Sequence, residues 1–145
     1  MWQHGKITRR GIDEVLAAAQ ARLRRLTPAR AAEAMHQGSV LIDTRDAEFR
    51  SRDGVIPGSV HIPLSVLEWR VDPTSGHQSP ALAGREDTLI LICHEGYSSS
   101  LAAARLHDLG FENTTDVIGG FVAWASADLP VELQRAATVA GRTPG

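Results

Sequence analysis

The residues best suited to chemistry lie in one short polar segment that contains the only cysteine of the chain. The segment consists of Cys93, His94, Glu95, Gly96, Tyr97, Ser98 and Ser99. The apolar run 88–93 leads into it, and the alanine- and leucine-rich run 99–110 follows, so we expect a strand, a tight loop and a helix. Such a loop turns several backbone N–H groups toward one point, and the helix adds the positive end of its dipole. A thiol at that point is stabilised as thiolate, which is the nucleophilic form of cysteine.

The residues around the cysteine favour a functional loop over a buried structural thiol. Gly96 permits backbone angles that other residues reach only with strain, so the amides can curl inward. Ser98 and Ser99 are suited to cap the helix and to donate hydroxyl hydrogens to an anion. Glu95 opposes a thiolate unless its carboxylate points to water, and we expect it to point outward.

Two other kinds of chemistry fit the sequence less well. A protein tyrosine phosphatase loop needs an arginine six residues after the cysteine to clamp a phosphoryl group, and that position is Ser99. A single cysteine excludes a disulfide framework, a CxxC pair and a thiolate zinc site. No two of the six histidines have the spacing of paired ligands on one helix, so we expect neither a metal nor a cofactor.

The length and composition of the chain indicate one small globular domain. The chain has 145 residues, 43% hydrophobic content and a net charge of −2, which suit one core and give no reason to expect nucleic acid or an anionic membrane as partner. The first residues carry no apolar segment of a secretory signal, and no run approaches a membrane span. With one unpaired thiol, these features predict a cytoplasmic protein.

Strand and helix patterns alternate along the chain. We expect helices at 12–26, 28–37, 47–54, 64–70, 99–110 and 120–130, and strands at 39–45, 55–63, 88–93 and 113–120. Thr27 and Pro28 read as a helix start, and Gly38 reads as its end. This alternation predicts an α/β fold with a parallel sheet, in which functional groups gather at the carboxyl ends of the strands.

Three stretches together resemble the single-domain rhodanese family, whose members are thiosulfate sulfurtransferase-like proteins. They are LIDTRDAEFRSRDGVIPGSVHIPL, LICHEGYSSSLAAARLHDLGF and DVIGGFVAWASADLPVE. The resemblance implies a rhodanese-like α/β fold with a central, mostly parallel five-stranded sheet and helices on both faces. We expect a helical extension at 1–26, the rhodanese-like domain at 27–133 and a flexible tail at 134–145. The extension may be read in three ways: it covers the sheet, docks a partner or pairs two copies of the chain.

The resemblance also implies a reaction. Cys93 would take a sulfane sulfur from a small donor, thiosulfate or a persulfide, and pass the sulfur from a persulfide to cyanide, a thiol or an acceptor protein. The loop amides from His94 to Ser99 would hold the sulfur, in the six-residue loop length associated with sulfur donors. The alternatives are an inactive rhodanese module used for protein binding or regulation, and a phosphatase- or arsenate-type loop.

The chain departs from the common family pattern at Ser98, where many members have an arginine. Arg70 is a candidate to supply the lost positive charge from another loop, although a surface arginine at a helix end explains it equally well. Trp69 is a candidate wall of the pocket. The resemblance implies that Asp43 and Arg45 tie a strand end to neighbouring loops as a salt bridge.

Overall fold

The computed structural model describes residues 8–134 of the chain. Within this range four parallel strands form one sheet in the order β2-β1-β3-β4. Their bounds are β1 Val40–Asp43, β2 Val60–His61, β3 Leu89–Ile92 and β4 Thr115–Asp116. In the central pair Asp43 lies opposite Ile92, so the carboxyl ends of both strands lie side by side. Cys93 follows directly at these carboxyl ends, where a parallel sheet presents its functional groups.

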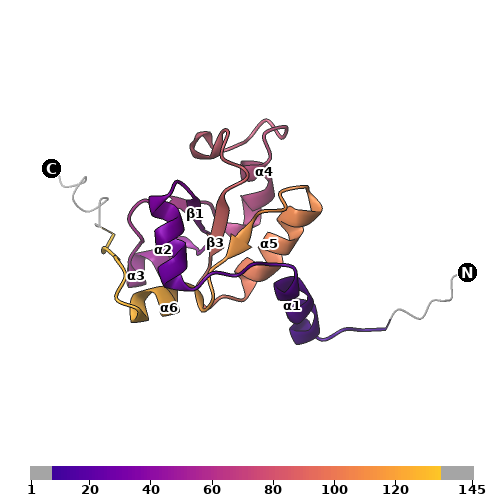
Figure 1. Ribbon diagram of the computed structural model, residues 1–145, viewed down its shortest axis with the longest axis horizontal. Coiled ribbons are helices and arrows are strands. Elements are labelled where there is room, and N and C mark those ends of the chain that lie inside the picture. Colours follow the sequence, from indigo (N-terminus) through magenta and orange to yellow (C-terminus); the bar gives the residue numbers. More distant parts are fainter. Residues whose placement is uncertain (1–7, 135–145) are drawn as a thin grey trace, which may run out of the picture.

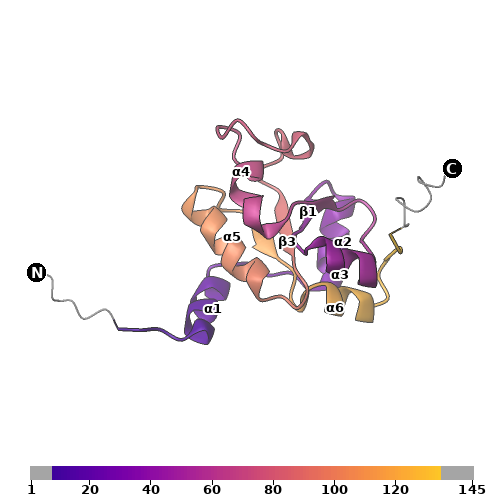
Figure 2. The same ribbon diagram turned by 180° about the vertical axis from the view of Figure 1, so that it is seen from behind.

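Helices cover both faces of the sheet (Figures 1 and 2). The α-helices are α1 Ile12–Ala21, α2 Pro28–His36, α3 Ala47–Asp53, α4 Leu67–Val71, α5 Ser98–Asp108 and α6 Gly120–Ser126, and the 3-10 helices are η1 Leu64–Val66 and η2 Pro80–Leu82. The helix starts and stops follow local chemistry. The Thr27 hydroxyl accepts from the Arg30 N–H at 3.2 Å to begin α2, and Gly38 follows that helix at a φ of 107°.

Alternate residues of the central strands build two separate hydrophobic cores. One core contains Val40 and Ile42 with α4 and α5, and consists of Val40, Ile42, Ile62, Leu67, Val71, Leu82, Leu89, Leu91, Ala102, Ala103 and Leu106. The other contains Leu41 with α2 and α6, and consists of Ala31, Leu41, Ile56, Ile90, Ile92, Val117, Phe121 and Trp124. This alternation is the period-two pattern of a strand buried on both faces. It confirms the predicted two-sided α/β architecture.

The sheet has four strands in the described residues where five were predicted. The place beside β4 is taken by one residue, Leu26, which forms a parallel bridge to Val117. Its N–H donates to the Asp116 carbonyl at 3.0 Å, and its carbonyl accepts from the Ile118 N–H at 2.8 Å. Pro28 lacks an N–H and begins α2 two residues later, so the chain leaves the sheet after a single pair.

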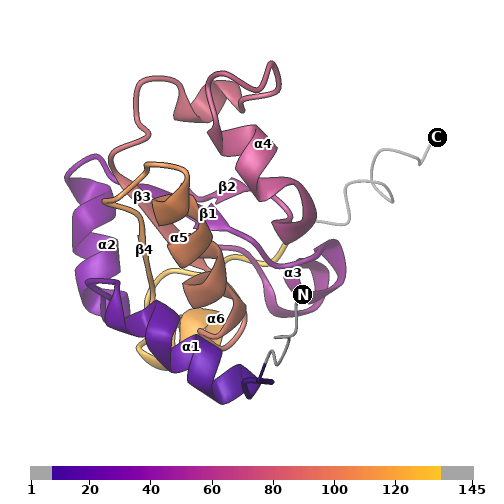
Figure 3. The same ribbon diagram turned by 90° about the vertical axis from the view of Figure 1, so that its right-hand side faces the viewer.

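The N-terminal helix is shorter than predicted and lies against the domain. It ends at Ala21, and a turn at Arg22 and Leu23 leads the chain to Leu26 beside β4. Figures 1 and 3 place α1 beside α5, and the Gln20 amide donates to the Ser100 hydroxyl at 3.2 Å. Residues 12–21 therefore lie against α5 and Leu26 lies beside β4, while docking of a partner and pairing of two copies stay predictions. Residues 1–7 of the extension and residues 135–145 of the predicted tail lie outside the described range.

Candidate active site

Cys93 is the first residue of a tight loop between β3 and α5, here called the cysteine loop (residues 93–97). Its sulfur accepts hydrogen bonds from the backbone N–H of Gly96 at 3.2 Å and of Ser99 at 3.3 Å. The Ser99 N–H belongs to the first turn of α5, so the sulfur also lies at the positive end of that helix. Both contacts favour negative charge on the sulfur. The residue is only 5% exposed, which places the thiol at the floor of a site.

Glycines bring a second backbone segment close to the cysteine loop. Gly96 has a φ of 91°, and a Cβ there would lie 2.7 Å from the Gly119 nitrogen. Gly120 has a φ of 61°, and a Cβ there would lie 2.6 Å from the Cys93 carbonyl oxygen. The Phe121 N–H donates to that oxygen at 2.8 Å. Only glycine combines these angles with such close approach, so the two segments hold the loop together.

A buried polar cluster supports the loop from the side of β4. Asp116 is fully buried and accepts from the hydroxyls of Ser99 at 2.7 Å and Ser100 at 2.6 Å. Arg25 donates to Asp116 through Nε at 2.8 Å and to the Gly96 carbonyl at 3.0 Å. The Cys93 thiol in turn donates to the Ser99 hydroxyl oxygen at 3.2 Å. These contacts connect Arg25 to the sulfur through two intervening side chains.

A second buried carboxylate lies at the end of β1. Asp43 accepts from Arg45 at 3.0 and 2.9 Å and from Arg50 at 3.1 Å, which gives two guanidinium groups for one carboxylate. Arg45 also donates to the Gly54 carbonyl at 2.8 Å and lies 3.8 Å over the ring of Phe121. Its remaining nitrogen is buried and has no hydrogen-bond partner among residues 8–134. The cluster of Asp43, Arg45 and Arg50 therefore carries one more positive charge than negative charge.

A pocket of about 340 Å³ opens above the sulfur. It is lined by Thr44, Arg45, Asp46, Phe49, Pro63, Leu64, Ser65, Cys93, His94 and Ser98. The ring of Phe49 packs on that of His94 with centroids 4.5 Å apart, which fixes one side of the opening. Its size suits a small molecule better than a protein segment.

A larger groove of about 900 Å³ adjoins this pocket between α4 and α5. The pocket and the groove share Leu64, Ser65 and Ser98. Trp69 lines the groove and is 56% exposed, so it is neither a core residue nor a wall of the cysteine pocket. A molecule in the groove would have direct access to the mouth of the cysteine pocket.

The other predicted site residues take different positions. Glu95 is exposed, as its expected outward direction requires, and Tyr97 is 59% exposed at the start of α5. Arg70 donates to the His77 carbonyl at 2.9 Å and is not among the residues that line the pocket. The structure thus brings Arg45, but not Arg70, to the cysteine pocket.

Sequence reasoning missed three residues of the site. Phe49 gave no signal beyond a short helical pattern, and Arg25 read as part of the basic run RLRRL on a helix. Asp116 carried the one usable signal, because an acidic residue interrupts the predicted strand 113–120 at its centre. A buried charge in such a place requires a partner, which here is Arg25.

An ion pair next to the site, outside the pocket, has shifted pKa values. Arg52 donates to both oxygens of Asp53 at 2.9 Å, which lowers the pKa of Asp53 and raises the pKa of Arg52. The nearby Arg45 guanidinium lowers the pKa of Asp53 further through its positive charge. Asp53 therefore stays a carboxylate at neutral pH.

Comparison with known proteins identifies the architecture. The family model described as a rhodanese-like domain matches residues 27–127. The chain belongs to the rhodanese-like family. Two relatives named thiosulfate sulfurtransferase GlpE support this assignment: the Haemophilus influenzae (strain PittEE) protein is 33% identical over 108 residues, covering 74% of this chain and 92% of the relative. The Pseudomonas savastanoi pv. phaseolicola protein is 37% identical over 102 residues, covering 70% and 86%.

A solved structure agrees with this rhodanese-like assignment over most of the chain. It is a Rhodopseudomonas palustris protein of unknown function described as a possible tyrosine phosphatase, 34% identical with a TM-score of 0.77. The match covers 88% of this chain and 98% of that one, so it extends well beyond the rhodanese-like domain model. None of the helices within residues 8–134 is long and apolar enough to cross a membrane.

Proposed function

We propose that this protein is a sulfurtransferase that carries a sulfane sulfur on Cys93. The observation that supports it most directly is the sulfur itself, held by the N–H groups of Gly96 and Ser99 at the floor of a small pocket. The relatives named thiosulfate sulfurtransferase support the same reaction class. The two amides stabilise the thiolate before attack and the terminal anion of a persulfide afterwards.

In the first half-reaction the Cys93 thiolate attacks the outer sulfur of thiosulfate. A sulfur–sulfur bond forms at Cys93, the sulfur–sulfur bond of thiosulfate breaks, and sulfite leaves with the bonding electron pair. In the second half-reaction cyanide or a thiolate attacks the outer sulfur of the persulfide. Thiocyanate or a new persulfide leaves, and the Cys93 thiolate is regenerated.

The charge that attracts the anionic donor comes from the end of β1. Ser98 supplies no cation, but Arg45 and Arg50 outnumber their shared partner Asp43. Asp46 also lines the pocket, yet it is exposed, so solvent and salt screen its charge. In this proposal the cluster of Asp43, Arg45 and Arg50 attracts the donor, the role for which the sequence suggested Arg70.

A phosphatase function is less well supported by the same geometry. Ser99 occupies the place of the arginine that clamps a phosphoryl group, and its hydroxyl is bonded to Asp116. A phosphate dianion in the loop would face a buried carboxylate in place of a guanidinium. The expected result is no turnover of para-nitrophenyl phosphate at a protein concentration that gives measurable thiosulfate–cyanide transfer.

The test of the proposal is the mass of the intact protein. After incubation with thiosulfate the wild-type mass should increase by one sulfur atom, and cyanide should remove the increase with release of thiocyanate. Cys93→Ser should show no increase. If thiosulfate, an alkyl persulfide and polysulfide all leave the wild-type mass unchanged, the transferase proposal is wrong and a binding module is favoured.

The natural acceptor is proposed only by class, as a thiol on a small molecule or on a protein. Transfer to a protein acceptor requires direct contact between a cysteine of the acceptor and the persulfide on Cys93. Cross-linking through Cys93, compared with the same treatment of Cys93→Ser, should capture such a thiol-bearing partner. Capture that is equal in the two proteins would show that the partner binds elsewhere.

A further inference from the structure

Asp116 is a buried carboxylate that no part of the proposed reaction uses. It is 0% exposed and lies behind the cysteine loop, where one oxygen accepts from both Ser99 and Ser100. The cation that the structure pairs with it is Arg25, whose Nε donates to the other oxygen at 2.8 Å. A buried carboxylate is costly unless it is paired and hydrogen-bonded, so Asp116 depends on Arg25.

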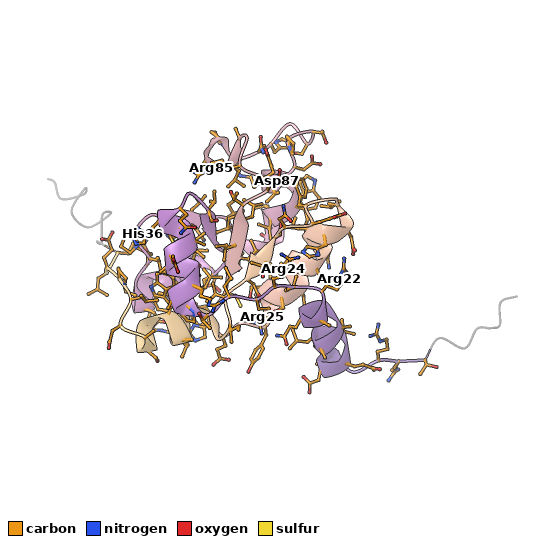
Figure 4. All side chains as sticks on the ribbon, in the orientation of Figure 1. Arg22, Arg24, Arg25, His36, Arg85 and Asp87 are labelled. Carbon is orange, nitrogen blue, oxygen red and sulfur yellow. The ribbon has the colours of Figure 1, made fainter. Side chains whose placement is uncertain are left out.

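Arg25 comes from the segment that links α1 to α2, 91 residues away from Asp116 in the chain. Figure 4 labels it together with Arg22 and Arg24 of the same segment. Its guanidinium also donates to the Gly96 carbonyl at 3.0 Å, and Gln20 of α1 donates to Ser100 at 3.2 Å. The N-terminal extension therefore reaches the loop that holds the sulfur.

The hydroxyl of Ser99 has one hydrogen and two nearby acceptors. Asp116 lies 2.7 Å from the hydroxyl oxygen, and the Cys93 sulfur lies 3.2 Å from it. While the hydrogen points to Asp116, a lone pair of the hydroxyl faces the sulfur, and this arrangement suits a protonated thiol that donates. A thiolate needs the hydrogen to turn toward the sulfur, and the negative charge of Asp116 opposes both that turn and the thiolate itself.

We infer that Asp116 and Arg25 are positioning residues that set how readily Cys93 loses its proton. Asp116 holds the Ser99 hydroxyl hydrogen away from the sulfur, and Arg25 offsets the charge of Asp116 so that the hydrogen can turn. The inference rests on Cys93 being the nucleophile of the proposed function. It adds that a segment before the matched domain tunes that nucleophile.

Other charged and titratable groups lie on the elements packed around the cysteine loop. They are Asp43, Arg45 and Asp46 at the end of β1, Arg50 and Asp53 of α3, and His94 and Glu95 of the loop itself. None of them is altered in the variants below. Their effect on the thiol is therefore common to all the proteins compared.

The test measures the rate of Cys93 alkylation by iodoacetamide against pH, with no sulfur donor present. Asp116→Asn should move the midpoint of the rate profile to lower pH, and Arg25→Met should move it to higher pH. About one pH unit below the wild-type midpoint, the rate should rise about 3- to 10-fold in Asp116→Asn and fall by a similar factor in Arg25→Met. Arg24→Met, which changes an exposed arginine of the same segment, should leave the profile in place.

Opposite shifts separate this role from a merely structural one, because loss of loop order would change both variants in the same direction. Shifts of the same sign, or an Arg25→Met profile that matches Arg24→Met, would overturn the inference. If Arg25→Met does not fold, the double variant Arg25→Met/Asp116→Asn, which leaves no unpaired charge, takes its place. Its midpoint should match that of Asp116→Asn, because Arg25 acts through the charge of Asp116, and a midpoint well above that of Asp116→Asn would overturn this role of Arg25.

The alkylation readout is independent of sulfur transfer. Opposite shifts without any persulfide from sulfur donors would leave this inference standing and reject the proposed function. Persulfide formation together with unshifted alkylation profiles would reject this inference and leave the proposed function standing.

Discussion

Two fully buried carboxylates flank Cys93, the proposed nucleophile: Asp43 at the end of β1 and Asp116 at the end of β4. Asp43 is held by Arg45 and Arg50, which lie two and seven residues further along the chain. Asp116 is held by Arg25, 91 residues away, and by two serines of the first turn of α5. The Asp43 cluster consists of residues that are close in sequence, whereas the Asp116 cluster joins three distant segments around the cysteine loop.

The difference between them is one of charge and of contact with the sulfur. The Asp43 cluster has an excess positive charge, and its member Arg45 is among the residues that line the cysteine pocket. The Asp116 cluster is neutral overall and touches the sulfur through the Ser99 hydroxyl. We therefore expect the first to contribute more to folding and the second to control the nucleophile.

The largest expected effect comes from Asp43→Asn. Loss of the carboxylate leaves Arg45 buried without a counter-ion, and breaking such a buried pair costs about 3–5 kcal/mol of unfolding free energy. Urea denaturation followed by circular dichroism measures this loss. Asp46→Asn is the matched control, since asparagine caps α3 as well as the aspartate that accepts from the Phe49 N–H. A loss below about 1 kcal/mol for Asp43→Asn, within the range of an exposed pair, would contradict the comparison.

Asp116→Asn should cost less stability than Asp43→Asn. Arg25 keeps its bond to the Gly96 carbonyl and its side chain is 17% exposed, so water can solvate part of the charge left behind. We expect a loss of about 1–3 kcal/mol, the range for hydrogen bonds to charged groups. The same urea titration measures it, side by side with Asp43→Asn. Equal losses in the two variants would show that both clusters are primarily structural.

The contrast between the two clusters also explains what the sequence could predict. Asp43 and Arg45 stand two residues apart at the end of a clear strand, and their pairing was expected from the family resemblance. The cysteine loop was accessible from local pattern, because an apolar strand, Gly96 and a helix follow one another directly. The two-sided sheet was accessible from the alternation of strand and helix patterns along the chain, and the two cores confirm it.

Long-range contacts account for what was missed. Arg25 lies in a basic run at helical spacing, and the helix was expected to continue to Leu26. In the fold Leu26 pairs with Val117 at the sheet edge, which carries Arg25 to Asp116. No local feature of RLRRL encodes that pairing. Arg70 was a candidate for the charge missing at Ser98, with a surface arginine at a helix end as the alternative reading; it lies in the last turn of α4, and its guanidinium donates to the His77 carbonyl.

The lower end of the comparison is a carboxylate that is only half-buried, Glu86. Its pKa is lowered by the side-chain amide of Gln78 and by backbone N–H groups including that of Gly84, and no cation is needed. Because the folded-state pKa lies below the ordinary value of 4.5, the stabilisation is present above that pH and is lost as pH falls through the folded value.

Glu86→Gln should therefore lower the urea midpoint slightly at pH 7 and leave it unchanged near pH 3. Urea titrations of wild type and variant at both pH values measure the difference. Asp87→Asn, which removes one charge from the same turn (Figure 4), controls for net charge. An effect as large as that of Asp116→Asn, or one that persists at pH 3, would show that burial is not what separates the carboxylates. The ranking of Asp43, Asp116 and Glu86 would then need another physical basis.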